Sequence, residues 1–184
     1  MNSGADVSRG FAVDPSAALE IAFGNILIER MTDVPIINPA IRVEAVGFEP
    51  TSAGWLGVMV TPWFMNLMLV PIAGQAWQPL PVGHKRRVSL PAGQFEFFGG
   101  CEDEIGEYLY CSMYSPMGQF SDHDSARATA REMCRLLFDK TTADKVREMN
   151  PSGLQWFETK KSESSGVSAC RRALLRGRPE TAGE

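Results

Sequence analysis

Residues 55–70 read WLGVMVTPWFMNLMLV, which is two apolar runs, Trp55–Val60 and Met65–Val70, on either side of Thr61-Pro62-Trp63-Phe64. Each run is short and almost wholly apolar, a pattern typical of strands that are buried on both faces. Pro62 has no N–H to donate and Pro71 ends the second run, so the two strands should be joined by a sharp turn. We therefore predict a sheet whose two faces are both covered by other parts of the chain, or whose second face contacts a partner.

Strand patterns continue before and after this pair. Ile41–Val46 alternates apolar with polar or small residues. Arg87–Leu90 and Gln94–Phe98 flank Pro91-Ala92-Gly93, which is typical of a hairpin turn. Ile105–Tyr114 also alternates, and its two faces differ in chemistry. One carries Ile105, Leu109, Cys111 and Met113, and the other carries Tyr108, Tyr110, Ser112 and Tyr114. Tyrosine tolerates a half-exposed position, so the second face is a candidate contact surface.

Two helices are predicted, one at each end of the strand region. Asp14 can cap the first, and Pro15 suits its first turn, where an N–H would have no partner anyway. Its apolar face runs to about Arg30 and consists of Leu19, Ala22, Phe23, Ile26 and Leu27. Ser121 should start the second helix, with Asp122 and Asp124 in its first turn. Its buried stripe is predicted to be Ala126, Ala130, Met133, Cys134 and Leu137, and its row of Arg127, Arg131 and Arg135 is interpreted as a solvated face.

The fold class predicted from these patterns is α+β. A single domain would contain a mostly antiparallel sheet of five to six strands, flanked by helices at Pro15–Arg30 and Asp122–Phe138. We expect residues 1–13 to form a flexible arm, 14–138 the α+β core, and 139–184 a poorly ordered tail with a motif at 171–177. The Ser-rich composition around 160–168 supports the prediction for the tail.

Charge and hydropathy exclude several classes of protein. The 184 residues carry 18 basic and 22 acidic side chains, a net charge of −4, so nucleic-acid binding has no electrostatic support. The imbalance is local, because residues 1–138 carry 9 basic and 15 acidic side chains whereas residues 139–184 carry 9 and 7. No apolar run reaches the roughly 20 residues that span a bilayer, so membrane insertion is not expected. Nothing marks Met1–Gly10 for export, and we expect a cytoplasmic protein.

The four cysteines, Cys101, Cys111, Cys134 and Cys170, include no C-x-x-C pair. Local sequence therefore supplies neither a zinc ribbon nor a rubredoxin-type iron site. Separate and mostly buried thiols are the favoured interpretation. A metal site would require Cys101, His84, His123 and nearby carboxylates to converge, which we do not expect. We predict no metal and no cofactor.

Catalytic motifs are also missing from the sequence. Ser121, His123 and Asp124 contain the residue types of a triad, but neighbours one or two apart on a helix do not face each other. There is no G-x-S-x-G, H-E-x-x-H, P-loop or dinucleotide-binding glycine pattern. We therefore expect no enzyme. The alternative is a small-ligand-binding or hydrolytic α+β domain, with Cys111 or Glu107 as its reactive group.

The middle of the chain favours a binding role. Its methionines and tryptophans would each be core residues taken singly, but as a group they favour a groove for an apolar, extended segment. The predicted apolar contacts are Trp55, Trp63, Met65, Leu67, Tyr108 and Tyr110. The acids Glu102, Asp103 and Glu104, with Glu107 nearby, form either a solubilising loop or a rim that attracts a basic peptide. We assign Glu102, Asp103 and Glu104 to a client's arginines.

Four blocks of the sequence form a distinctive set in this order. The central block carries Trp55, Gly57, Thr61, Pro62 and Pro71. Leu90-Pro91-Ala92-Gly93 is a turn, and the next block runs from Tyr108 to Met117, with Cys111, Ser115 and Pro116. The last block is Arg171-Arg172-Ala173-Leu174-Leu175-Arg176-Gly177. Together these blocks resemble the HybE/HupJ/HoxT family of [NiFe]-hydrogenase assembly chaperones, and the resemblance runs from about Ala18 to Gly177.

The resemblance implies a non-enzymatic chaperone for maturation of an uptake [NiFe] hydrogenase. Its implied partners are the small-subunit precursor, with its twin-arginine signal peptide, and the large subunit as a further client. Such a leader is a basic pair followed by an apolar stretch, which complements an acidic rim beside an apolar surface. Rubredoxin-like relatives carry C-x-x-C pairs that this chain lacks, so no iron-binding role is carried over. Arg171 and Arg172 themselves resemble a twin-arginine motif that could occupy the protein's own groove, although a solvated tail is the favoured interpretation.

Overall fold

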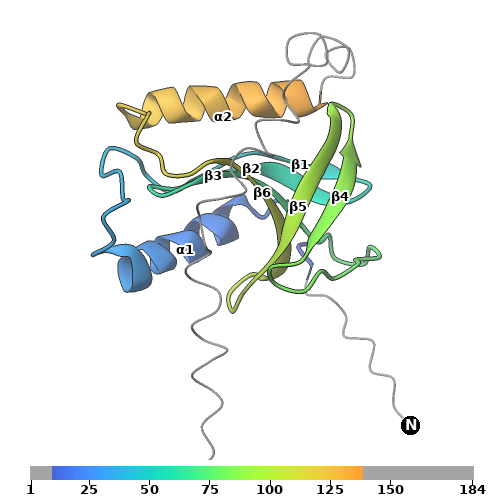
Figure 1. Ribbon diagram of the computed structural model, residues 1–184. Coiled ribbons are helices and arrows are strands. Elements are labelled where there is room, and N and C mark those ends of the chain that lie inside the picture. Colours follow the sequence, from blue (N-terminus) through green and yellow to red (C-terminus); the bar gives the residue numbers. More distant parts are fainter. Residues whose placement is uncertain (1–9, 139–184) are drawn as a thin grey trace, which may run out of the picture. The chain divides into compact units, whose positions relative to one another are not determined.

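The computed structural model describes residues 10–138, which form one antiparallel sheet with a helix on each face (Figure 1). Its six strands lie in the order β1-β2-β3-β6-β5-β4, and every neighbouring pair is antiparallel. The strands are β1 (Glu44–Thr51), β2 (Gly54–Val60), β3 (Met65–Val70), β4 (Lys85–Leu90), β5 (Gly93–Glu102) and β6 (Gly106–Tyr114). The helices are α1 (Ser16–Ile26), which continues as a wider π-helical turn, η1 (Leu27–Met31), and α2 (His123–Phe138). The predicted α+β class, antiparallel sheet and two flanking helices are confirmed.

One face of the sheet packs against α2. Because side chains alternate along a strand, β2 and β3 each send every second residue to this face, where Leu56, Val58, Leu67 and Leu69 are buried. From α2 come four buried residues of the predicted stripe, Ala126, Ala130, Cys134 and Leu137.

The opposite face packs against α1. Leu19, Ala22 and Phe23 of the helix contact a cluster that includes Met59 and Met68 of the two central strands. Both faces of β2 and β3 are thus covered, which explains why these strands show no polar alternation.

The turn between β2 and β3 is held by Thr61. Its hydroxyl accepts the N–H of Phe64 at 3.0 Å and donates to the Phe64 carbonyl, while the Thr61 N–H bonds the same carbonyl at 2.8 Å. The Ser115 hydroxyl donates to the Trp63 carbonyl at 3.3 Å, which ties the turn to the end of β6. The predicted sharp turn at Pro62 is confirmed.

Three local predictions need correction. Ile105 packs in the cluster on the α1 face, whereas Leu109 and Cys111 pack in the cluster on the α2 face, so Ile105 does not share their face. The pairing of β3 with β6 shifts register between Met65 and Asn66, and this irregularity returns Tyr114 to the α2 face, where its ring contacts Phe120. Tyr114 therefore does not share a face with Tyr108. Helix α2 begins after Asp122, whose carboxylate accepts the N–H of Ser125 at 2.7 Å, so Asp122 rather than Ser121 is the capping residue.

Within the predicted arm, Phe11 is paired with the chain that follows β3. Its N–H donates to the Pro71 carbonyl at 2.9 Å, and its carbonyl accepts the Ala73 N–H. The Trp55 indole N–H also donates to the Phe11 carbonyl, at 3.0 Å. Residues 1–9 and 139–184, including the predicted tail and the motif at 171–177, lie outside the described residues.

Candidate functional site

The acidic turn between β5 and β6 is docked against the end of α1. Arg30 Nη2 donates to Glu102 Oε2 at 2.7 Å, and Asn25 Nδ2 donates to Glu104 Oε1 at 3.0 Å. Glu102 and Glu104, both assigned to a client's arginines, therefore already accept hydrogen bonds from this chain. Glu102 is half-buried, whereas Asp103 and Glu104 are exposed, so the turn still presents carboxylates to solvent beside the helix.

Aromatic rings form a continuous row across the α1 face. Phe23 lies edge-on to Phe64 and to Tyr108, with ring centroids 5.7 and 6.4 Å apart. The row continues from Tyr108 to Tyr110 at 6.1 Å and from Tyr110 to Phe98 at 5.9 Å. Burial raises the pKa of both tyrosines, so their phenols are neutral at physiological pH. Tyr110 and Phe98 are half-buried, so the far end of the row remains partly accessible.

The other predicted apolar contacts are mostly internal. Trp55 is half-buried, but Trp63 is 8% exposed, Met65 0% and Leu67 1%. Methionines 59, 68 and 117 are likewise fully buried. The predicted open methionine surface is therefore wrong for these residues, because a helix covers each face of the central strands. As folded, Met65 and Leu67 lie in the core under α2 and are not accessible to a client.

The residues that carry the family resemblance occupy positions with specific structural demands. A Cβ at Gly57 would lie 2.5 Å from the Phe48 ring, so only glycine fits there. Pro71 provides the carbonyl that anchors Phe11, and Pro116 follows Ser115 through a cis peptide bond. Cys111 is buried and burial raises the pKa of its thiol to about 11, which does not suit a nucleophile.

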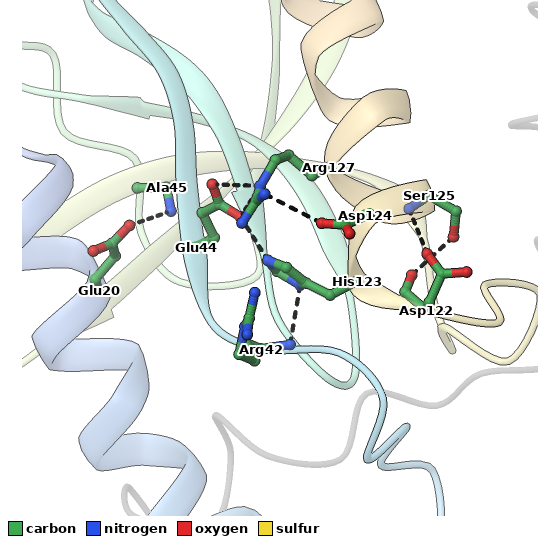
Figure 2. Close-up of polar contacts among 9 residues, drawn as sticks. All are labelled: Glu20, Arg42, Glu44, Ala45, Asp122, His123, Asp124, Ser125 and Arg127. Carbon is green, nitrogen blue, oxygen red and sulfur yellow. Dashed lines mark hydrogen bonds and ion pairs between the residues drawn. The ribbon is translucent and has the colours of Figure 1, made fainter.

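The network that fixes α2 on the sheet was not predicted (Figure 2). His123 Nε2 lies 2.6 Å from Glu44 Oε2, and His123 Nδ1 accepts the N–H of Arg42 at 3.1 Å. Arg127 Nε donates to both Glu44 oxygens, at 2.9 and 2.8 Å, so Arg127 is not simply part of a solvated face. Burial alone would raise the pKa of Glu44, but the hydrogen bonds from Arg127 and His123 hold it below its ordinary value. These contacts join β1, and the residue Arg42 just before it, to the first turns of α2, so the network acts as a tether between the two elements.

Metal-ligating side chains are dispersed over residues 10–138. No group of three or more His, Cys, Asp or Glu side chains in this range is placed to hold a metal ion. The three described cysteines are unpaired with one another, Cys101 being exposed and the other two buried. His84 and His123 lie on different parts of the chain, the first in the exposed loop before β4.

Across the described part of the chain, no helix is long and apolar enough to cross a membrane.

Comparison with known proteins assigns the family. The pattern of the family described as "[NiFe]-hydrogenase assembly, chaperone, HybE" matches residues 14–177. The chain therefore belongs to the HybE family of hydrogenase assembly chaperones, as its motifs predicted.

Its relatives include curated proteins and a solved structure. It is 43% identical over 136 residues to the protein HoxT of Cupriavidus necator, covering 68% of this chain and 76% of HoxT. It is 39% identical over 152 residues to the hydrogenase expression/formation protein HupJ of Bradyrhizobium diazoefficiens, covering 78% of this chain and 88% of HupJ. The solution structure of HybE from Escherichia coli matches with a TM-score of 0.58 at 27% identity, over 70% of this chain and 80% of that one.

Proposed function

We propose that this chain is a non-enzymatic chaperone that holds the small-subunit precursor of an uptake [NiFe] hydrogenase, including its twin-arginine signal peptide, until assembly is complete. The large subunit is a further client in this proposal, and the complex forms in the cytoplasm. Membership of an assembly-chaperone family supports the general role. Binding of the twin-arginine signal peptide is supported by the position of the acidic turn. Its Asp103 and Glu104 are exposed, and Glu104 accepts a hydrogen bond from Asn25 of α1.

The chemistry of recognition follows from the client's leader. An arginine pair would meet carboxylates at the turn, where opposite charges steer association. The apolar stretch that follows the arginines needs an apolar surface next to those carboxylates. Glu102 is half-buried and paired with Arg30, whereas Asp103 and Glu104 are exposed, so on the ground of exposure we expect these two acids to contribute most to a client's arginines.

Neutralising these two acids tests the electrostatic part of the proposal. We expect Asp103→Asn with Glu104→Gln to weaken binding of a twin-arginine leader peptide about 5- to 30-fold, since exposed charge pairs contribute roughly 0.5–1 kcal/mol each. Fluorescence anisotropy measures the peptide's affinity at low salt and at a high salt concentration that screens exposed charges. The matched control is Glu132→Gln, which removes an exposed acid on α2. Equal affinities for all three proteins, unaffected by salt, would contradict the electrostatic role of the turn.

Co-purification tests the client itself. A tagged form of the full chain should retrieve the hydrogenase small-subunit precursor from cells that are producing the hydrogenase. Removing the precursor's leader should reduce the yield of complex. Failure of the tagged chain to retrieve either hydrogenase subunit would refute the proposed function.

A further inference from the structure

Helix α1 has a second apolar side that faces solvent. Ala17, Ile21, Gly24 and Ile28 follow one another at intervals of four, three and four residues. In an α-helix this spacing keeps side chains on one narrow stripe. Ala17, Ile21 and Gly24 lie in α1, and Ile28 lies in η1, the π-helical turn that continues it. Ile21 is 64% exposed and Ile28 is 74% exposed, and both are among the most exposed large apolar side chains of residues 10–138.

This outer stripe lies opposite the side by which α1 binds the sheet. The inner side buries Leu19, Ala22 and Phe23 against the core. Helix α1 is therefore apolar on both sides, unlike α2, whose apolar residues lie on one side only. A helix that is apolar all round is normally covered all round, and neighbouring exposed apolar side chains mark an interaction surface.

Negative charge is concentrated at one end of the stripe. Glu29 and Asp33 are exposed just after Ile28. The acidic turn, Glu102 to Glu104, is held against the same end of the helix by Arg30 and Asn25. Five carboxylates, 29, 33, 102, 103 and 104, thus lie close to Ile28, and the printed ion pair at this end joins Glu102 to Arg30, so this end of the stripe is acidic. The C-terminal end of a helix also carries partial negative charge, which adds to the attraction for cations.

We propose that the outer stripe of α1 is the docking surface for a helical client segment that is apolar on one side and basic at one end. This inference rests on the proposed chaperone function and assigns the apolar contact to α1 instead of the buried strand residues. Ile21 and Ile28 supply the apolar area, and Ala17 and Gly24 let the backbone of the client helix come close. The basic end of the segment lies over Glu29 and the acidic turn.

A peptide-binding experiment with the full chain tests the docking surface. The probe is a synthetic peptide with two adjacent arginines followed by a leucine- and alanine-rich helix of about four turns. Ile21→Gln and Ile28→Gln should each raise the Kd at least about ten-fold, since each removes one large apolar contact. The matched control, Val82→Gln, replaces another exposed aliphatic side chain, in the loop before β4, and should leave the Kd unchanged. A peptide with glutamates in place of the arginines should bind more weakly than the probe.

The inference would be overturned if the natural chain did not bind the probe peptide. It would also be overturned if the two isoleucine variants had the same Kd as the natural chain, or if Val82→Gln raised the Kd as much as they do. Because Ile21 and Ile28 are exposed, the variants should keep their melting temperature, which circular dichroism verifies. Sedimentation equilibrium tests whether a second copy of the chain, instead of a client, covers the stripe. A dimer that Ile28→Gln dissociates would show that a second copy of the chain covers it and would refute the proposal.

Co-purification separates this inference from the proposed function. If the natural chain and the Ile21→Gln/Ile28→Gln variant retrieve the small-subunit precursor equally, the stripe is not the docking surface and the chaperone function stands. If the natural chain retrieves no hydrogenase subunit, the proposed function fails, and the peptide titration still decides whether α1 binds basic apolar helices.

Discussion

Replacing Glu44 by glutamine probes the tether that holds α2 on the sheet. The carboxylate accepts two hydrogen bonds from Arg127 and one from His123 (Figure 2). Glutamine retains the acceptor for His123, but it loses the charge and places an amide NH₂ against the guanidinium. Hydrogen bonds to charged groups contribute about 1.5–3 kcal/mol each. The Glu44 side chain is 23% exposed, so solvent screens part of this contribution, and we expect Glu44→Gln to lower the free energy of unfolding by about 1–2 kcal/mol in total. For a domain of this size that corresponds to roughly 3–10 °C in melting temperature.

The pH dependence of this loss identifies its cause. The folded protein holds the pKa of Glu44 below its ordinary value, so the unfolded chain binds the proton more tightly. The stabilisation is therefore complete above the pH at which the unfolded carboxyl titrates, and it is lost as the pH falls through the lower folded-state pKa. Urea unfolding at a series of pH values should show a difference between the natural chain and Glu44→Gln that is full near neutrality and shrinks below about pH 4.5.

The exposed pair of Glu132 and Arg135 provides the control for this experiment. These residues form an ion pair at 2.6 Å, but both side chains are more than half exposed. Glu132→Gln should therefore change the free energy of unfolding less than Glu44→Gln does. A loss in Glu44→Gln that is independent of pH, or no larger than the loss in Glu132→Gln, would refute the tether.

Two further predictions concern packing and thiol reactivity. Gly57→Ala should lower the free energy of unfolding by roughly 1–3 kcal/mol, because its methyl group would meet the Phe48 ring; an unchanged urea midpoint would contradict that contact. In a Cys170→Ser background, iodoacetamide should alkylate only the exposed Cys101 of the folded protein, because burial raises the pKa of Cys111 and Cys134 to about 11; mass spectrometry showing one of these two modified before Cys101 would contradict their burial.

The sheet was predictable because its signals are local. The apolar runs on either side of Thr61-Pro62-Trp63-Phe64 indicate two strands that are buried on both faces, and the structure covers those faces with α1 and α2. Tyr114 was assigned to the wrong face because a register shift between Met65 and Asn66 interrupts the alternation, and no residue type marks that shift in the sequence.

The candidate site was harder to predict, because composition does not show which apolar residues are covered. Met65 and Met68 have the residue type of an adaptable binding surface, but their position in the central strands places them in the core. Glu44 lies 79 residues from His123 in the sequence, so their pairing has no local signal. By contrast, the spacing of Ile21 and Ile28 was available from the sequence as a second apolar side of the first helix.

Hydrogen–deuterium exchange of the full chain, alone and bound to the hydrogenase small-subunit precursor, tests the account most directly. Binding should slow exchange along residues 16–31 and in the acidic turn from Glu102 to Glu107, because those backbone segments become covered by the client. Protection confined to α2 or to the free edge of β4, with residues 16–31 unchanged, would contradict the assignment of client binding to α1 and the acidic turn.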